Sequence, residues 1–327
     1  MRDLLLSFAS RAYMLASRKP RLVVVALHRL GHLSKIQPCH VERCFRFLAA
    51  HFTVVRPSEL DLMKRERRIA VVTIDDGHAD AYRCIFPIAK TIGLPISVCI
   101  PTDFFFRRKW LWFDQFDWVM HHAKPAATAT IEGFQVSVEE ASSVAKFRSY
   151  LKRCLPAARD SAIQQLSYCW DLELPSSPPE QCRALTVPEL QQMLSSGLVE
   201  VVGHTATHTI ATVLSEGDFE NELRQSKDEW ESFCGRPIMS FCYPNGGPGD
   251  FDRRTAMTIK RVGYRYAFTL LEGTNLVQTM DPLEIKRVHI HWRPGVCYKL
   301  ISGMADLQNS LSHSNAAETN ASRHSLH

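Results

Sequence analysis

Two adjacent carboxylates, Asp75 and Asp76, follow an apolar run and precede Gly77. Buried parallel strands place their functional residues at the C-terminal end, where the following loops form a site. Neighbouring carboxylates repel each other, so a bound cation or hydrogen bonds must offset the cost of holding them together. The alternative is that the pair caps a helix over 79–92. This pattern alone does not separate a metal site from a helix cap.

A pair of histidines, His204 and His208, directly follows a second apolar run, Val-Glu-Val-Val. Two histidines four residues apart can reach one metal ion from a single turn of chain. The sequence contains 14 histidines, so such a pair also arises by coincidence, but its position at a strand end favours a site. Two histidines and one carboxylate suit zinc or another divalent transition metal and leave positions open for water.

A third group is the segment Phe-Cys-Tyr-Pro-Asn-Gly-Gly over 241–247, again after an apolar run. Proline and glycine favour a tight loop whose backbone N–H groups can face an anionic oxygen. An ordinary turn is the alternative explanation for this segment taken alone.

The elements that must position these groups are strands alternating with helices. Short apolar, β-branched runs predict strands over 22–27, 52–55, 69–74, 96–100, 199–202, 238–242, 266–270 and 285–291. Helical periodicity predicts helices over 41–50, 79–92, 110–122, 139–154, 187–196, 216–234, 251–262 and 294–304. Such alternation indicates an α/β fold with a parallel sheet. Seven or eight units favour a distorted (β/α) barrel of seven or eight parallel strands.

The segment between the strands at 96–100 and 199–202 is too long for one crossover connection. We therefore expect a helical insertion over about 104–185 within a barrel that spans 21–305. The insertion begins with an aromatic run, Trp110 to Phe113, followed by Asp114. These side chains are interpreted either as a sugar-binding surface or as a cluster that packs the insertion against the barrel.

The two ends of the chain have different predicted roles. Residues 1–20 predict a helix with Leu5, Phe8, Ala12 and Leu15 near one face. We expect this face to pack on the domain; the alternative is a membrane-surface helix with basic residues at its edge. The tail over 306–327 is rich in Ser, Asn, Ala and His and is expected to be disordered.

Composition narrows the classes of function. The net charge is +5, but Lys and Arg are spread along the chain, so we expect no nucleic-acid partner. The ten cysteines include no Cys-x-x-Cys pair and are expected to be buried thiols in a reducing compartment. The apolar runs are shorter than the roughly 18–20 residues of a membrane span.

The three groups, in this order, resemble the polysaccharide deacetylase family with the NodB homology domain (carbohydrate esterase family 4). The first motif of that family, Thr-Phe-Asp-Asp-Gly, reads Thr-Ile-Asp-Asp-Gly here, with Ile74 replacing Phe. The second, His-Ser/Thr-x-x-His, matches fully over 204–208. The third, Arg-x-Pro-Tyr-Gly, matches only at Pro244 and Gly246, because Cys242 stands where the family has arginine.

Two further segments resemble the branch that includes biofilm-polysaccharide deacetylases. Leu-His-Arg over 27–29 is similar to its Tyr-His-Arg opening, and Glu-Leu-Arg-Gln-Ser-Lys-Asp-Glu-Trp over 222–230 is similar to the helix after its second motif. The resemblance covers roughly 20–292, interrupted by 104–185.

The resemblance implies a metal-dependent hydrolase that removes acetyl groups from an acetylated sugar polymer or oligosaccharide. It assigns the metal ligands to Asp76, His204 and His208, and the general base to Asp75. It also implies that the loop at Asn245 stabilises the oxyanion, through the Asn245 backbone N–H. Zinc is the expected ion, with cobalt, manganese and nickel as alternatives.

The family usually supplies a general acid from a late Leu-x-His motif, which this sequence lacks in clear form. Strand alternation over 285–291 places Arg287, His289 and His291 on one face. We predict that Arg287 pairs with Asp75 in place of the missing arginine and that His289 is the acid. The alternative is that both histidines are surface residues beyond the strand end.

Two other functions fit the sequence. One is an amide hydrolase that acts on a small non-sugar substrate, and the other is a relative that binds a glycan without cleaving it. A site that only binds has no need of Asp75, which argues against the second. By resemblance, we expect a cytoplasmic location, at the inner face of the membrane if the N-terminal helix contacts it.

Overall fold

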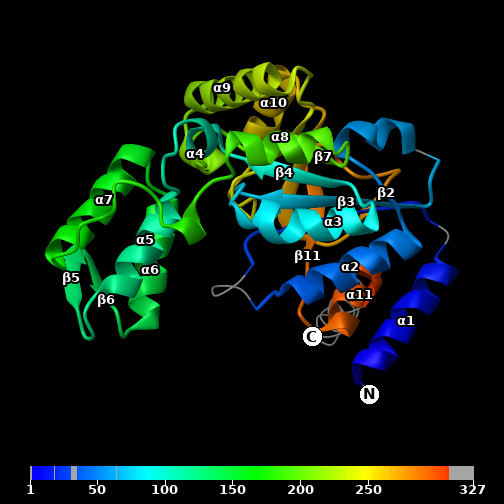
Figure 1. The fold of residues 1–327 in the computed structure, drawn as a ribbon, viewed down its shortest axis with the longest axis horizontal. Coiled ribbons are helices and arrows are strands. Elements are labelled where there is room, and N and C mark those ends of the chain that lie inside the picture. Colours follow the sequence, from blue (N-terminus) through cyan, green and yellow to red (C-terminus); the bar gives the residue numbers. More distant parts are fainter. Residues whose placement is uncertain (1, 18, 31–34, 64, 309–327) are drawn as a thin grey trace, which may run out of the picture.

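A closed barrel of parallel strands forms the centre of the computed structural model, which describes residues 2–17, 19–30, 35–63 and 65–308. Within these residues, seven strands form the ring (Figure 1). They are β1 (Arg21–Leu27), β3 (Arg68–Asp75), β4 (Ile96–Ile100), β7 (Val199–Gly203), β8 (Ser240–Cys242), β9 (Tyr266–Glu272) and β11 (Ile285–His289). They pair in that order, and β11 pairs back with β1. The predicted parallel barrel is confirmed, with the lower of the two strand counts.

Two short strands lie outside the ring. The predicted strand over 52–55 is β2 (Thr53–Val54), which pairs with β3. Because β3 also pairs directly with β1 along its whole length, the barrel closes without β2. A second short strand, β10 (Asn275–Leu276), runs antiparallel to the start of β1.

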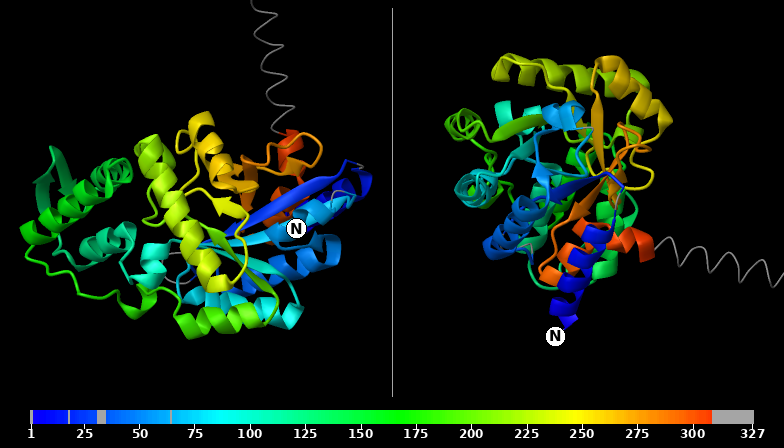
Figure 2. Two further views of the ribbon diagram at one scale, coloured as in Figure 1. Left: turned by 90° about the horizontal axis from the view of Figure 1, so that it is seen from above. Right: turned by 90° about the vertical axis from the view of Figure 1, so that its right-hand side faces the viewer.

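Helices surround the barrel, as the two views of Figure 2 show. They are α2 (Pro38–His51), α3 (Phe86–Ile92), α8 (Val187–Ser195), α9 (Glu216–Cys234), α10 (Arg253–Val262) and α11 (Pro294–Ser302). A π-helical turn at Ala81–Ile85 precedes α3, and 3-10 turns lie at Pro57–Met63 and Ala211–Val213. Val23 and Val25 pack beneath the helices, whereas Leu22 and Val24 fill the barrel interior. Strands buried on both faces explain the continuous apolar runs of the sequence.

The insertion packs around a hydrophobic core of its own, to one side of the barrel (Figure 1). It contains α4 (Thr102–Phe106, at the barrel edge), α5 (Trp112–His122), α6 (Ala141–Lys152), α7 (Pro156–Cys169) and a 3-10 turn at Glu180–Cys182. The expectation of a purely helical insertion is wrong, because β5 (Thr128–Ile131) and β6 (Phe134–Ser137) form a hairpin. Glu132 and Gly133 both have positive φ, as a two-residue hairpin turn requires.

The N-terminal helix α1 (Arg2–Ala16) packs against α11 through a face that the sequence did not indicate. Ser10 and Met14 are buried, whereas Leu5, Phe8 and Leu15 are 63 %, 75 % and 77 % exposed. The expectation that this apolar face packs on the domain is therefore wrong. The helix contacts its own domain with the opposite side.

The C-terminal tail was expected to be disordered from residue 306. Residues 304–308 are helical, and Asp306 accepts a hydrogen bond from the Thr274 N–H at 3.1 Å. The rest of that predicted segment lies outside the described residues. All ten cysteines are free thiols, but the expectation that they are buried holds for only five of them. Three are half-buried, and Cys39 and Cys169 are exposed.

Among the described helices, none combines the length and apolar character that crossing a membrane requires.

Candidate metal and catalytic centre

The residues of the three sequence groups meet at the C-terminal end of the barrel. Asp75 is the last residue of β3, His204 follows β7, and Cys242 is the last residue of β8. The residue at the N-cap of the turn before α3 is Asp80, so neither aspartate of the pair caps that helix. The helix-cap alternative is therefore wrong.

The chain turns sharply between the two aspartates. Asp76 and Gly77 both have positive φ, at 70° and 79°. A Cβ atom on Gly77 would lie 2.6 Å from the side chain of Ile100, so only glycine fits there. The left-handed backbone at Asp76 costs energy, and such strain gathers at functional sites. This turn sends the Asp76 carboxylate toward the histidine loop.

Asp76, His204 and His208 form a compact group of ligand atoms that lie within 4.8 Å of one another. His208 Nε2 lies 3.2 Å from Asp76 Oδ1, and His204 Nε2 lies 3.7 Å from the same oxygen. His204 Nδ1 is tied to the Cys242 carbonyl at 2.7 Å, which fixes the ring. Its buried Nε2 has no hydrogen-bond partner among the described residues. A histidine that binds a metal ion through one ring nitrogen usually donates a hydrogen bond from the other, which fixes the ring. His204 has this arrangement.

The loop that carries the histidines is held by Glu222 of α9. Its carboxylate accepts hydrogen bonds from the backbone N–H groups of Ala206 at 2.8 Å and Thr207 at 2.9 Å. Thr205 and His208 have positive φ, at 61° and 57°, and these bonds help to hold that strained backbone. The sequence marked the helix over 222–230 as family-like, but it did not reveal this role of its first residue.

Asp75 lies beside the metal-ligand group and is held by Arg287 of β11. Arg287 Nη1 lies 2.8 Å from Asp75 Oδ1, and both side chains are buried. Burial alone would raise the pKa of Asp75, but the charge and hydrogen bond of Arg287 hold it well below its usual range. The ion pair that strand alternation predicted is therefore present.

Cys242 occupies the position where the family motif has arginine, and an arginine on another strand takes over its place beside Asp75. Cys242 Sγ lies 3.7 Å from Asp75 Oδ1, so this position faces the same carboxylate from β8. Arg287 reaches it from β11, and its Nε also donates to the Thr269 carbonyl at 2.6 Å. The positive charge beside Asp75 is supplied by a different strand. Asp75, Cys99 and Cys242 form a second close group of potential ligands, but its carboxylate is already paired with Arg287.

A histidine that the sequence analysis did not assign, His28, lies next to Asp75. It follows β1 directly, and its Nε2 lies 3.4 Å from Asp75 Oδ2. Its side chain is 39 % exposed, so it reaches both the carboxylate and solvent. The signal available in the sequence was the Leu-His-Arg segment after the first strand.

His289, the predicted acid, is the last residue of β11 and lies at the rim of the site. Its ring stacks near that of His28, with centroids 6.0 Å apart. Although His289 is exposed to solvent at the strand end, desolvation of its ring, together with the neighbouring His28 and Arg287, lowers the pKa of His289 to about 4. His291 lies beyond the strand, where its Nδ1 accepts the Arg293 N–H.

The insertion reaches the site through Asp114, which is only 2 % exposed. Its carboxylate pairs with Arg29 and accepts from His78 Nε2 at 2.7 Å. The other nitrogen of His78, Nδ1, is buried without a hydrogen-bond partner among the described residues and lies 4.0 Å from Asp76 Oδ2. Asp114 is buried in this chain of contacts, and its contact with substrate stays a prediction.

The aromatic run before Asp114 divides between two roles. Trp112 is 4 % exposed and lies in the hydrophobic core of the insertion, with Arg159 over its ring. Packing, rather than sugar contact, explains this residue. Phe113 instead lies edge-on to His208, with ring centroids 5.4 Å apart.

The third sequence group forms a tight loop after β8. Asn245 and Gly246 have positive φ, at 60° and 69°. The Gly246 carbonyl accepts from the Leu270 N–H at 2.7 Å, and a Cβ on Gly246 would lie 2.9 Å from that nitrogen. The loop is thus anchored to the strand beside it. No described residue accepts a hydrogen bond from the Asn245 N–H.

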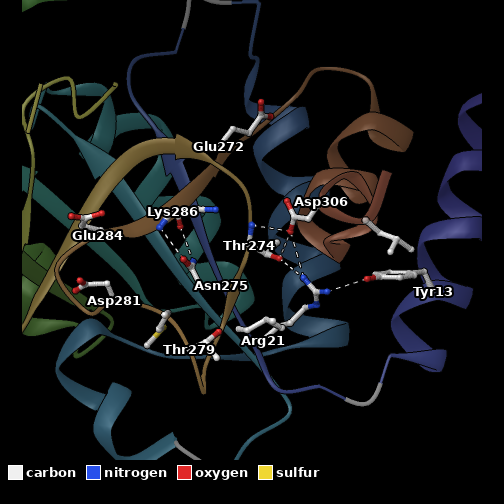
Figure 3. Close-up of a pocket in the computed structure, with 13 residues that line it drawn as sticks. Tyr13, Arg21, Glu272, Thr274, Asn275, Thr279, Asp281, Glu284, Lys286 and Asp306 are labelled. Carbon is white, nitrogen blue, oxygen red and sulfur yellow. Dashed lines mark hydrogen bonds and ion pairs between the residues drawn. The ribbon is translucent and has the colours of Figure 1, made fainter. Parts of the chain in front are cut away.

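A separate cavity of about 600 Å³ lies near the other end of β1 (Figure 3). Arg21, the first residue of that strand, donates to Thr274 Oγ1 at 2.6 Å and to the Tyr13 hydroxyl at 3.0 Å. The lining of this cavity includes none of the residues of the three sequence groups. The residues of the three sequence groups lie instead at the carboxyl ends of the barrel strands, and a smaller hollow is lined by His28 and His289.

Comparisons with known proteins agree with this geometry. Residues 179–267 match the family described as polysaccharide deacetylase. No curated protein is a significant match to the sequence.

Three solved structures share the fold over most of the chain. A deacetylase from Streptococcus pyogenes, PplD in complex with acetate, is 13 % identical, with a TM-score of 0.57 over 86 % of this chain and 97 % of that one. IcaB from Ammonifex degensii is 18 % identical, with a TM-score of 0.57 over 88 % and 98 %. A polysaccharide deacetylase from Bacillus cereus is 17 % identical, with a TM-score of 0.55 over 88 % and 69 %. Residues 179–267 thus resemble the polysaccharide deacetylase family, and the chain shares the barrel fold of these solved deacetylases.

Proposed function

We propose that the protein is a metal-dependent hydrolase that removes acetyl groups from an acetylated amino-sugar polymer or oligosaccharide. The observation that carries the proposal is that two adjacent carboxylates have different partners. Asp76 shares a compact ligand group with His204 and His208, whereas Asp75 is held ionised beside it by Arg287. Environments that separate two neighbouring carboxylates in this way indicate two chemical roles.

Asp76, His204 and His208 would hold the ion, and zinc suits a ligand set of two imidazoles and one carboxylate. The buried, unpartnered Nε2 of His204 and the nearby Asp76 oxygen fit such an ion. A divalent ion held by these residues would polarise the acetyl carbonyl and would lower the pKa of a bound water molecule toward ~7.

Asp75 is the proposed general base. It is buried, stays ionised because of Arg287, and has its second oxygen turned toward His28 rather than toward another acid. An ionised carboxylate at this position accepts the proton of the attacking water molecule.

His28, rather than His289, is the proposed proton donor to the leaving amine. It combines contact with Asp75 and access to solvent, so it can receive a proton and pass it outward. With a pKa of about 4, His289 is uncharged at neutral pH and has no proton to give as an imidazolium. The N–H of Asn245 is the proposed oxyanion donor, because the anchored loop leaves it free of other described partners.

The alternative of a relative that only binds glycans has less support. Holding a buried, ionised Asp75 beside the ligand group has no use in a site that only binds sugar. A small non-sugar amide remains the competing substrate class, and the assay below separates it from a glycan.

Acetate release from a panel of N- and O-acetylated oligosaccharides, with a small imide as comparison, tests the proposal. We expect release from an N-acetylated glycan, loss of release after chelation, and recovery when zinc, cobalt, manganese or nickel is restored. Release that is unaffected by chelation would contradict the metal role. Hydrolysis of the imide alone would show that the substrate is a small amide rather than a glycan. The assignment of the site residues would be unaffected.

A further inference from the structure

The outward face of α1 is apolar, although the helix lies on the molecular surface. Leu4, Phe8 and Leu15 are 76 %, 75 % and 77 % exposed, and Leu5 is 63 % exposed. A helix turns by roughly 100° per residue, so the first three lie within roughly 40° of one another. Among the described residues, only Leu62 and Tyr168 are other large hydrophobic side chains that are 75 % exposed or more. The exposed apolar surface is therefore concentrated on this helix.

The orientation of α1 is fixed by its inner side. Asp3 forms an ion pair with Arg293 at 3.1 Å, and Tyr13 accepts a hydrogen bond from Arg21 at 3.0 Å. At Gly295 of α11 the two helices are so close that a Cβ atom would lie 2.7 Å from the Asp3 carbonyl oxygen. These contacts hold the helix in one orientation. It therefore does not rotate to bring Leu4, Phe8 and Leu15 into the protein interior.

An apolar groove continues this face toward α11. A cavity of about 410 Å³ is lined by Leu5, Leu6, Ala9 and Val296, with the cationic side chains of Arg293 and Lys299 beside them. An apolar surface bordered by cations is typical of helices that lie in a lipid headgroup layer.

The charge around this face is positive. Residues 1–20 contain four basic residues and one acidic residue, and that acid, Asp3, is already paired with Arg293. Arg11 borders the apolar stripe, and both Arg11 and Lys19 are exposed. The surface thus combines an apolar stripe with unneutralised cations, which is complementary to an anionic lipid bilayer.

We propose that the outer face of α1, with the groove toward α11, binds the surface of an anionic membrane. Arg11 lies within the helix at the edge of the stripe, so the helix lies along the surface with Leu4, Phe8 and Leu15 entering the acyl boundary. The expected cytoplasmic location agrees, since that leaflet carries the anionic lipids. A second copy of the chain is a poorer occupant, because a symmetric contact through this face would bring the cations of both copies, Arg11 and Lys299, into one interface.

Vesicle flotation of the full chain tests this proposal independently of any enzymatic activity. Vesicles of phosphatidylcholine are compared with vesicles of equal parts phosphatidylcholine and phosphatidylglycerol. We expect binding to the anionic vesicles to exceed binding to the neutral ones by at least ~10-fold and to weaken in high salt.

Two variants and two matched controls make the result specific. The triple change Leu4→Ser, Phe8→Ser, Leu15→Ser should lower binding by at least ~10-fold, because it removes the apolar contact. The double change Arg11→Glu, Lys299→Glu should abolish the preference for anionic lipid. Leu62→Ser, at a site that is 76 % exposed elsewhere, and Arg253→Glu should bind like the wild type.

Thermal unfolding of each variant checks that the exposed substitutions leave the fold intact. Equal binding by the triple variant and the wild type would overturn the proposal, as would wild-type protein that floats with neither vesicle. A dimer in solution that the triple variant dissociates would also overturn it, by assigning the face to a second copy.

Discussion

Asp75 and Asp76 are neighbours in sequence, yet they face different partners. The positive φ at Asp76 turns its carboxylate to the two histidines, while Asp75 continues the strand and meets Arg287. The adjacent acids, the histidine pair and even Arg287 could be predicted, because strand ends and strand alternation bring such residues together. Cys242 of β8 stands where the family motif has arginine, and Arg287 of β11 supplies the positive charge beside Asp75 instead.

The sequence analysis assigned no role to His28 or His78. His28 was indicated only through the Leu-His-Arg segment over 27–29, and His78 is one histidine among 14 with no spacing that distinguishes it. His28 of one strand end lies 3.4 Å from Asp75 of the next strand, a contact that depends on the pairing of β1 with β3. His78 lies 4.0 Å from Asp76, two residues before it, because the chain turns sharply between them.

The two histidines at the rim should respond differently to mutation. His28→Ala is expected to lower kcat by ~10²–10⁴-fold with unchanged metal content, since it removes a positioned proton donor. His289→Ala should keep the alkaline limb of the pH–rate profile, because a group with a pKa of about 4 is already deprotonated there. Measuring kcat from pH 5 to 10 in both variants tests this. Loss of the alkaline limb in His289→Ala alone would return the donor role to His289.

At the scale of elements, the insertion is tied to the metal-ligand group. Arg29, Asp114 and His78 form a buried line of contacts that ends 4.0 Å from the second oxygen of Asp76. Asp114 belongs to α5 of the insertion, whereas Arg29 follows β1 and His78 follows β3. Besides packing beside the barrel, the insertion thereby reaches close to Asp76, the proposed metal ligand.

This link predicts an effect on metal affinity. Asp114→Asn and His78→Gln should each weaken metal binding by ~10–100-fold, as changes behind a metal ligand commonly do. Asp117→Asn is the matched control, because it lies on the same helix but pairs with Arg148 at the surface. Competition titration with a metal indicator gives the affinities, and melting of the metal-free proteins checks folding. Wild-type affinity in both variants would show that the contacts only pack the insertion.

Helices and strands were predicted correctly where a segment has a strong hydrophobic pattern. The prediction failed where contacts with distant residues determine the structure. The barrel strands are continuous apolar runs, and their positions were predicted closely. The β5–β6 hairpin was missed because its alternation covers only four residues on each side of Glu132 and Gly133. For α1 the apolar face was found, but the docking face contains Ser10 and Tyr13, which carry no hydrophobic period.

At the scale of the whole molecule, barrel closure is what assembles the site. The strands β1, β3, β7, β8 and β11 each contribute a residue at or just after their last position. Since these strands are far apart in sequence, only a closed parallel ring brings all five ends to one mouth. The proposed lipid-binding face lies along the side of this ring, on α1 and α11 (Figure 1). Catalysis and membrane contact would thus use separate surfaces.

The central claim is the division of labour between the two aspartates, and joint measurement of metal content and acetate release tests it most directly. Asp75→Asn should retain the metal ion and lose ~10²–10⁴-fold in rate, because the base is gone and the ligands remain. Asp76→Asn should lose the metal ion and, with it, activity. Glu200→Gln, a buried carboxylate earlier in β7 that accepts from Ser58, should change neither. Asp75→Asn without metal, together with an active and metallated Asp76→Asn, would contradict the account.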